Sequence, residues 1–95
     1  MIIELDGSKI KSEADFHKQL ALSLDIREFY GNNLNALWDL LSASVERPIE
    51  LVWINSNISR SNMGDSYEKI INILERTRLQ DEEFHLKEKF TYKTI

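Results

Sequence analysis

Two short runs of apolar residues have the composition of β-strands. The first is 2–5 (Ile-Ile-Glu-Leu), and Asp6-Gly7 directly after it indicates a turn. The second is 49–54 (Ile-Glu-Leu-Val-Trp-Ile), which is rich in strand-forming residues and follows Pro48, a residue type that ends helices. We therefore expect 49–54 to form a mostly buried, central strand.

Three further segments have apolar residues at the spacing of an amphipathic helix. Phe16, Leu20 and Leu24 recur every four residues behind Ser12, whose side chain is suited to cap a helix N-terminus. The segment from about 65 to 79 has the same helical spacing. Between these two lies an apolar stripe made of Leu34, Leu37, Trp38, Leu41 and Val45. We expect each stripe to face a common core.

The C-terminal part of the chain predicts one more strand. Phe84, Leu86 and Phe90 share the parity of a strand, but Glu88 has the same parity and interrupts the apolar face, so we expect a strand over only about 83–87. The segment 55–64 contains mostly turn-forming residues and is expected to be irregular or to form one helical turn. The order strand, helix, helix, strand, helix, strand predicts a single α/β domain over residues 1–95. Its small sheet should be mainly parallel, since right-handed helical crossovers join parallel strands.

Composition narrows the classes of protein to which this chain can belong. Its 95 residues, of which 42% are apolar, suit one domain with one core. No stretch reaches the ~18 consecutive apolar residues of a transmembrane helix, and the first residues do not resemble a signal peptide. The absence of cysteine excludes disulfides, thiolate nucleophiles and cysteine-based zinc sites. We expect a soluble, cytoplasmic protein.

Negative charge is concentrated in the first half of the chain. Residues 1–50 contain nine Asp or Glu and five Lys or Arg, whereas residues 51–95 contain seven of each, which accounts for the net charge of −4. Glu28, Asp39 and Glu46 lie in a stretch that has no Lys or Arg. Such a stretch repels a phosphate backbone and attracts a basic partner. We therefore expect no direct binding of nucleic acid here.

Candidate catalytic groups do not form a known constellation. His17 and His85 are far apart in sequence, neither has a nucleophile motif nearby, and no glycine-rich phosphate loop occurs. Asp39 and Glu46 would lie about 10 Å apart on one helix, too far to share a proton, and a glycosidase would need a deep cleft that so small a domain rarely has. We predict no enzymatic activity, no cofactor and no metal. A hydrolase would need both histidines in one pocket with a carboxylate.

The helix predicted to carry the apolar stripe from Leu34 to Val45 also has a polar stripe, which lies on a different face. At 100° per residue, its members fall within about 60° of one another; they are Asn35, Asp39, Ser42 and Glu46. The pattern alone favours an ordinary solvated surface with the nearby aromatic residues in the core. It also allows a recognition face, on which Asp39 would meet a lysine or arginine while the aromatic residues Phe29, Tyr30 and Trp38 exclude water around the pair.

The segment 29–39 carries a specific resemblance. It reads Phe-Tyr-Gly-Asn-Asn-Leu-Asn-Ala-Leu-Trp-Asp and closely resembles the signature of the barstar family of ribonuclease inhibitors. The flanking sequence agrees over about residues 1–88, with Asp6-Gly7 after the first strand and Pro48 before the second. The resemblance implies a three-stranded, mainly parallel sheet packed with three to four helices. It also implies an intracellular bacterial inhibitor, an immunity protein or antitoxin, of a secreted cytotoxic ribonuclease.

The resemblance also implies roles for individual residues. The loop and second helix would enter the cationic active site of a small basic ribonuclease in a one-to-one complex, without nucleic acid or membrane. Asp39 would mimic a substrate phosphate, Asn33 and Trp38 would fix the loop and helix, Phe29 would offer an aromatic contact, and Gly31 would permit the turn. The complete set of expected partner-binding residues is Phe29, Tyr30, Gly31, Asn33, Asn35, Trp38, Asp39, Ser42 and Glu46.

Three positions depart from the family's namesake. Asn35 replaces a second acidic group, Ser44 replaces an aromatic residue, and Arg76 replaces another carboxylate. Arg76 would place positive charge against a positive cleft, so we predict a different cognate nuclease that still recognises Asp39. These departures also leave open an adaptor with the same fold that binds a basic, non-nuclease protein through the same face. The residues beyond Lys89 have no counterpart in the resemblance.

Overall fold

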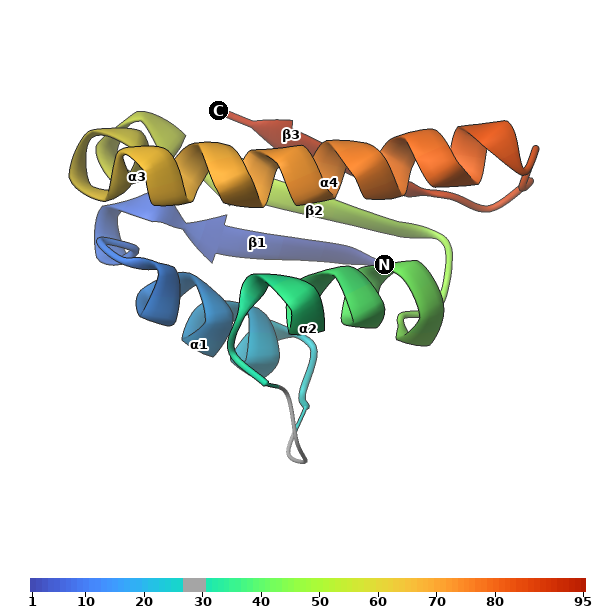
Figure 1. The fold of residues 1–95 in the computed structure, drawn as a ribbon, viewed down its shortest axis with the longest axis horizontal. Coiled ribbons are helices and arrows are strands. Elements are labelled where there is room, and N and C mark those ends of the chain that lie inside the picture. Colours follow the sequence, from blue (N-terminus) through green and yellow to red (C-terminus); the bar gives the residue numbers. More distant parts are fainter. Residues whose placement is uncertain (27–30) are drawn as a thin grey trace.

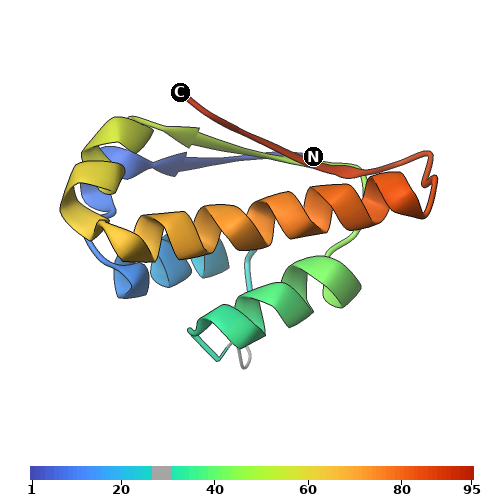
Figure 2. The same ribbon diagram turned by 45° about the horizontal axis from the view of Figure 1, so that its top comes forward.

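The computed structural model of this chain describes residues 1–26 and 31–95. Its three strands, β1 (Ile2–Asp6), β2 (Ile49–Ile54) and β3 (Phe90–Thr94), form one sheet in the order β1-β2-β3. Both strand pairs are parallel. The helices gather on one face of this sheet, so the molecule has two layers (Figures 1 and 2). The predicted α/β class with a parallel sheet is confirmed.

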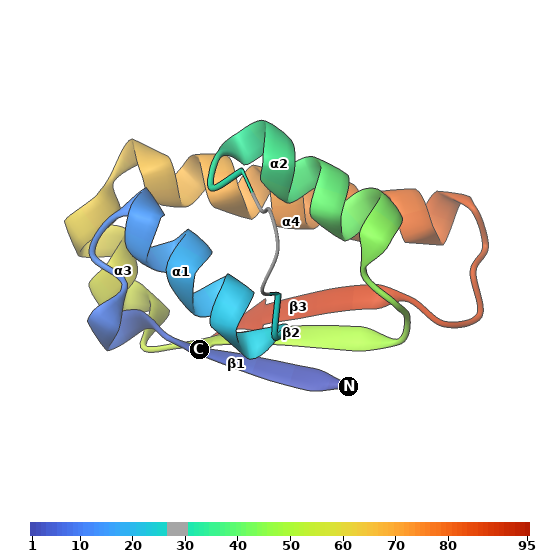
Figure 3. The same cartoon turned by 90° about the horizontal axis from the view of Figure 1, so that it is seen from below.

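Helical segments provide both crossovers between the parallel strands. Figure 3 shows the two layers edge-on, with the helices above the sheet. Helices α1 and α2 connect β1 to β2, and α3 and α4 connect β2 to β3. The segments are η1 (Gly7–Lys9), α1 (Glu13–Ser23), α2 (Leu34–Asp39), η2 (Leu40–Ser44), α3 (Ser56–Met63) and α4 (Asp65–Glu83). No helix among the described residues is long and apolar enough to cross a membrane.

The core lies between the sheet and the helical layer. Strand residues alternate between the two faces, so Leu5, Leu51 and Trp53 are buried against the helices while Glu4 points away from them. Trp53 is fully buried, and its indole Nε1–H donates to Ser59 Oγ at 3.1 Å. The Ser59 hydroxyl in turn donates to the Gly7 carbonyl oxygen at 2.8 Å. This chain of hydrogen bonds joins β2, α3 and η1 inside the core.

The last strand lies in a different place from the one expected at 83–87. Helix α4 continues to Glu83, and β3 begins only at Phe90. Phe84 and Leu86, whose parity suggested a strand, are 62% and 38% exposed, respectively. Phe90 is buried instead, and the aromatic ring of Tyr92 stacks on it with 6.3 Å between centroids. Parity alone could not distinguish the pair Phe84 and Leu86 from the pair Phe90 and Tyr92, because the residues of both pairs are two positions apart.

Two helical segments also differ from expectation. The second predicted helix is regular only to Asp39 and then widens into the π-helical turn η2, in which Val45 N donates to the Leu40 carbonyl oxygen at 3.1 Å. The segment 55–64, expected to be irregular or a single turn, contains the eight-residue helix α3. Its buried residues are Ser56 and Ser59, and a helix that buries serines leaves no apolar stripe to detect.

Candidate binding surface on the second helix

The start of α2 is held by Asn33, the residue expected to fix the loop and helix. Its Oδ1 accepts a hydrogen bond from Ala36 N at 2.8 Å, which is an N-cap, and its Nδ2 donates to the Gly31 carbonyl oxygen at 3.1 Å. Asn32, just before it, has a φ of 52°, in the left-handed region. Both side-chain bonds tie the end of the loop to the first turn of the helix, which therefore has a defined direction. Phe29 and Tyr30 lie outside the described residues.

The polar face of α2 presents two exposed polar residues to solvent. Asp39, the last residue of α2, is exposed, as is Asn35 one turn earlier. Asp39 forms no hydrogen bond or ion pair with any described residue. Leu37 and Leu41 are fully buried on the opposite side, as the apolar stripe predicted. Among residues 1–26 and 31–95, no group occupies the carboxylate of Asp39.

The polar stripe does not extend along one helix to its end. Ser42 lies in η2 and is half-buried, in a groove that it shares with Arg47 and Asp81. Glu46 is exposed but lies beyond the helix, because Val45 already has extended backbone angles of −89° and 131°. The assumption of 100° per residue thus holds for Asn35 and Asp39, whereas Ser42 and Glu46 are placed by the π-helical turn and the chain after it.

Trp38 connects α2 to α4. It is half-buried against the core, and the guanidinium carbon of Arg76 lies 4.2 Å from the centroid of its indole ring. This is the geometry of a cation–π interaction. A groove of about 360 Å³ follows the contact between the two helices; its walls are Leu34, Asn35, Trp38, Lys69, Asn72, Ile73 and Arg76. Arg76 was a candidate from the sequence, whereas Lys69 and Asn72 were not, although helical spacing places them with Arg76 on one side of α4.

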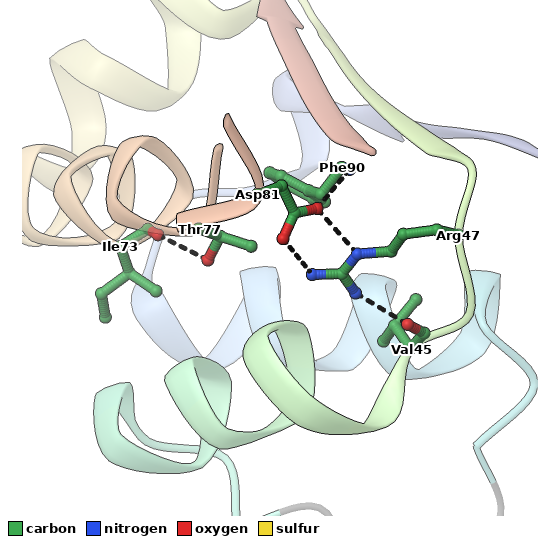
Figure 4. Close-up of polar contacts among 6 residues, drawn as sticks. All are labelled: Val45, Arg47, Ile73, Thr77, Asp81 and Phe90. Atoms are coloured by element: carbon green, nitrogen blue, oxygen red, sulfur yellow. Dashed lines mark hydrogen bonds and ion pairs between the residues drawn. The ribbon is translucent and has the colours of Figure 1, made fainter. Parts of the chain in front are cut away.

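A buried ion pair fixes the other end of this surface, as Figure 4 shows. The Asp81 carboxylate accepts from Arg47 Nε at 2.8 Å, from Arg47 Nη2 at 3.1 Å and from Phe90 N at 2.7 Å. Arg47 Nη1 also donates to the Val45 carbonyl oxygen at 2.7 Å. The Arg47 guanidinium therefore links the end of η2 to α4, and the Asp81 carboxylate links α4 to the start of β3. No sequence motif pointed to this pair.

The environment of Asp81 favours its charged form. Burial by itself raises the pKa of this carboxyl, but the hydrogen bonds from Arg47 and from Phe90 N, with the charges of Arg47 and Lys89, lower the pKa below its ordinary value. The Asp81 side chain is almost completely inaccessible, whereas 13% of the Arg47 side chain is exposed. A buried pair of this kind is strongly destabilised when one partner is removed, because the other charge remains without a partner.

The two histidines occupy unlike environments. His17 is buried in α1, where its Nε2 lies 2.9 Å from Glu13 Oε2 and its ring makes an edge contact with Phe16. His85 is exposed in the turn after α4 rather than on the last strand, and its φ is 54°. A shared pocket for both histidines is therefore not formed. Within residues 1–26 and 31–95, the structure contains no cluster of three or more side chains able to hold a metal ion.

Comparison with known proteins gives two findings. Residues 1–92 match the family described as "Barstar (barnase inhibitor)". A relative from Bacillus subtilis (strain 168), named "Putative ribonuclease inhibitor YrdF", is 32% identical over 82 residues. These residues make up 84% of this chain and 90% of the relative. The family match extends past residue 88, where the resemblance of the sequence was expected to end, and includes the first part of β3.

Proposed function

This chain belongs to the barstar family, and we propose that it inhibits a cytotoxic bacterial ribonuclease by covering the enzyme's active site with α2 and with residues 29–33 before it. The family and the relative support the role of an inhibitor rather than of an enzyme. The observation that carries the finer proposal is the exposed, unpaired carboxylate of Asp39 at the end of a helix whose start is capped by Asn33.

The proposed mechanism is replacement of substrate phosphate by a carboxylate. A ribonuclease binds the RNA backbone with cationic groups, so an acidic side chain that reaches these groups can form charge-assisted hydrogen bonds with them. Asp39 supplies this side chain. Because the surrounding residues exclude water once the complex has formed, the interaction contributes more than the same pair would in solvent.

The scaffold of α2 supports the role of Asp39. The Asn33 cap and the packing of Leu37 and Leu41 hold the helix in one position before binding, so less conformational entropy is lost in the complex. Phe29, Tyr30 and Gly31, which precede α2 in the sequence, also contact the nuclease in this proposal. Asn35, Trp38, Ser42 and Glu46 surround Asp39 and complete the contact area.

The proposed complex contains one inhibitor and one small basic nuclease. An interface of standard size needs about 800 Å² from each partner, or about 20 residues, which one helix and its flanking segments can provide. Negative charge in the first half of the chain would also steer the inhibitor toward a cationic cleft. As an immunity protein or antitoxin, it would act in the cytoplasm, where the nuclease would otherwise meet the RNA of its own cell.

Capture of the nuclease tests this proposal. The wild-type protein, Asp39→Ala and the matched control Glu4→Ala are immobilised and incubated at low salt with lysate and secretome of the source organism. Glu4 is an exposed residue of β1, and strand alternation directs it away from the helices, so its replacement removes the same charge elsewhere. Ribonuclease activity left in solution is measured, and captured proteins are identified by mass spectrometry.

We expect the wild type and Glu4→Ala to remove a small basic ribonuclease, and Asp39→Ala to bind it at least about 100-fold more weakly, which is the usual effect of removing one partner of a buried interfacial charge pair. Equal capture by all three proteins would contradict the role of Asp39. Capture of a basic protein that is not a nuclease would instead support the adaptor function.

A further inference from the structure

The groove between α2 and α4 has positive charge on one wall. Lys69 and Arg76 are both exposed on α4, seven residues apart, which is two helical turns or about 10 Å along the axis. Ile73 between them is buried and contributes an apolar floor, and Asn35 from α2 contributes an amide to the other wall. The groove is thus a partly apolar surface with cations at two points along one side.

The two cations of the groove are not neutralised within the part of the chain that the structure describes. Neither Lys69 nor Arg76 forms an ion pair there. Glu75, the acidic residue next to Arg76 in α4, is paired elsewhere: its carboxylate pairs with Arg78 at 2.7 Å and accepts from the Tyr92 hydroxyl at 2.9 Å. Negative charge on α2 is likewise unpaired, at Asp39. The exposed surface near Trp38 therefore carries negative charge at Asp39 and positive charge at Arg76 and Lys69.

Arg76 is held in place before any partner arrives. Its guanidinium lies over the indole ring of Trp38, and this contact restricts a long side chain that would otherwise sample many rotamers. A guanidinium stacked on a ring keeps its N–H groups at the edge, where they can bind a carboxylate in bidentate fashion. Trp38 directly precedes Asp39 in α2, so Arg76, stacked on Trp38, belongs to the surface that borders Asp39.

We propose that the groove formed by Leu34, Asn35, Trp38, Lys69, Asn72, Ile73 and Arg76 receives an acidic side chain of the target ribonuclease, from the surface next to its cationic active site. This inference rests on the proposed function and specifies the partner. A nuclease with a uniformly cationic surface would place like charges against Arg76 and Lys69, which weakens binding. A nuclease with an Asp or Glu beside its cleft would match both signs, so Arg76 and Lys69 select among nucleases while Asp39 binds the feature they share.

Charge reversal at the groove tests the proposal with the full chain. Arg76→Glu and Lys69→Glu are compared with the wild type, with Asp39→Ala and with the matched control Lys93→Glu. Lys93 is an exposed residue of β3, so its reversal changes the net charge equally outside the groove. The probe is the ribonuclease activity of the source organism's lysate and secretome. The measured quantity is the amount of each protein that removes half of this activity at low salt.

We expect Arg76→Glu and Lys69→Glu to need about 10- to 100-fold more protein than the wild type or Lys93→Glu. Lys69→Glu leaves the contact between Arg76 and Trp38 intact, so a folding defect of Arg76→Glu would not obscure the result. Once the captured nuclease is identified, replacing its facing carboxylate by arginine should restore binding to Arg76→Glu.

The outcomes separate this inference from the proposed function. If Asp39→Ala binds weakly while Arg76→Glu and Lys69→Glu bind as well as the wild type or better, the acidic contact is wrong and the inhibitor function stands. If Asp39→Ala binds as tightly as the wild type, the proposed function is wrong at its central residue. If the wild type removes no ribonuclease activity, both proposals fail.

Discussion

Asp39 and Asp81 are carboxylates in opposite situations. Asp39 is exposed at the end of α2 and has no partner among the described residues, whereas Asp81 is buried in α4 and accepts three hydrogen bonds. The Asp81 carboxylate contributes to the fold because its charge is fully paired inside the molecule. Asp39 can contribute little to the fold, since an exposed carboxylate without a partner loses nothing when the chain unfolds. Asp81 therefore supports the structure beneath the candidate binding surface, whereas Asp39 is available to bind a partner at that surface.

The two regions are nevertheless connected. The Arg47 guanidinium that binds Asp81 also donates to the Val45 carbonyl oxygen, one residue after η2. Helix α2 runs directly into η2, so the pair holds the C-terminal end of the segment whose N-terminal end is capped by Asn33. The exposed binding face thus lies between two fixed points, one at each end.

Replacement of Asp81 is expected to have the largest effect on stability. Asp81→Ala leaves the buried Arg47 guanidinium and Phe90 N without their acceptor, so we predict a loss of about 3–5 kcal/mol in the free energy of unfolding. Asp39→Ala, the matched control, should change it by no more than about 0.5 kcal/mol. Urea unfolding followed by tryptophan fluorescence measures both. Similar losses for the two variants would remove the distinction between a structural and a binding carboxylate.

The pH dependence of stability gives a second test of the structural role of Asp81. The pKa of Asp81 is lowered in the folded protein, so its ionised form stabilises the fold above the pKa of an unfolded Asp, about 3.9, and that contribution is lost as the pH falls through the folded pKa. The difference in unfolding free energy between the wild type and Asp81→Asn should therefore be constant near pH 7 and shrink below about pH 4. Urea unfolding at a series of pH values tests this. A difference that stays constant down to pH 2 would contradict the assignment.

Replacement of the helix caps should change the stability less than replacement of Asp81. Asn33→Ala and Ser12→Ala each remove an N-cap, of α2 and α1 respectively, and each should cost about 1 kcal/mol. Only Asn33→Ala should also weaken capture of the ribonuclease, because α1 does not carry Asp39. Unfolding curves and the capture assay, applied to both variants, distinguish the two effects. Equal capture would show that the direction of α2 does not depend on this cap.

Several elements could be predicted from the sequence because their signals are local. Strand β2 and helix α1 agree with their apolar patterns, and Ser12 caps α1 by accepting from Asp15 N at 3.2 Å. The position of β3 and the presence of α3 could not be predicted. The carboxylate of Asp81 holds the start of β3 at Phe90, and α3 buries serines that bond to distant groups. Both depend on residues far apart in the chain.

The sequence by itself determined the fold class, the apolar side of α2 and the candidate residues from Gly31 to Asp39, since helical spacing and a short motif depend only on near neighbours. Tertiary structure alone decided which charges are free and which are paired. The crossover that lays α4 beside α2 places Arg76 on Trp38, and the same packing brings Asp81 to Arg47. Ionic contacts between distant segments follow from the three-dimensional path of the chain, and no period in the sequence encodes them.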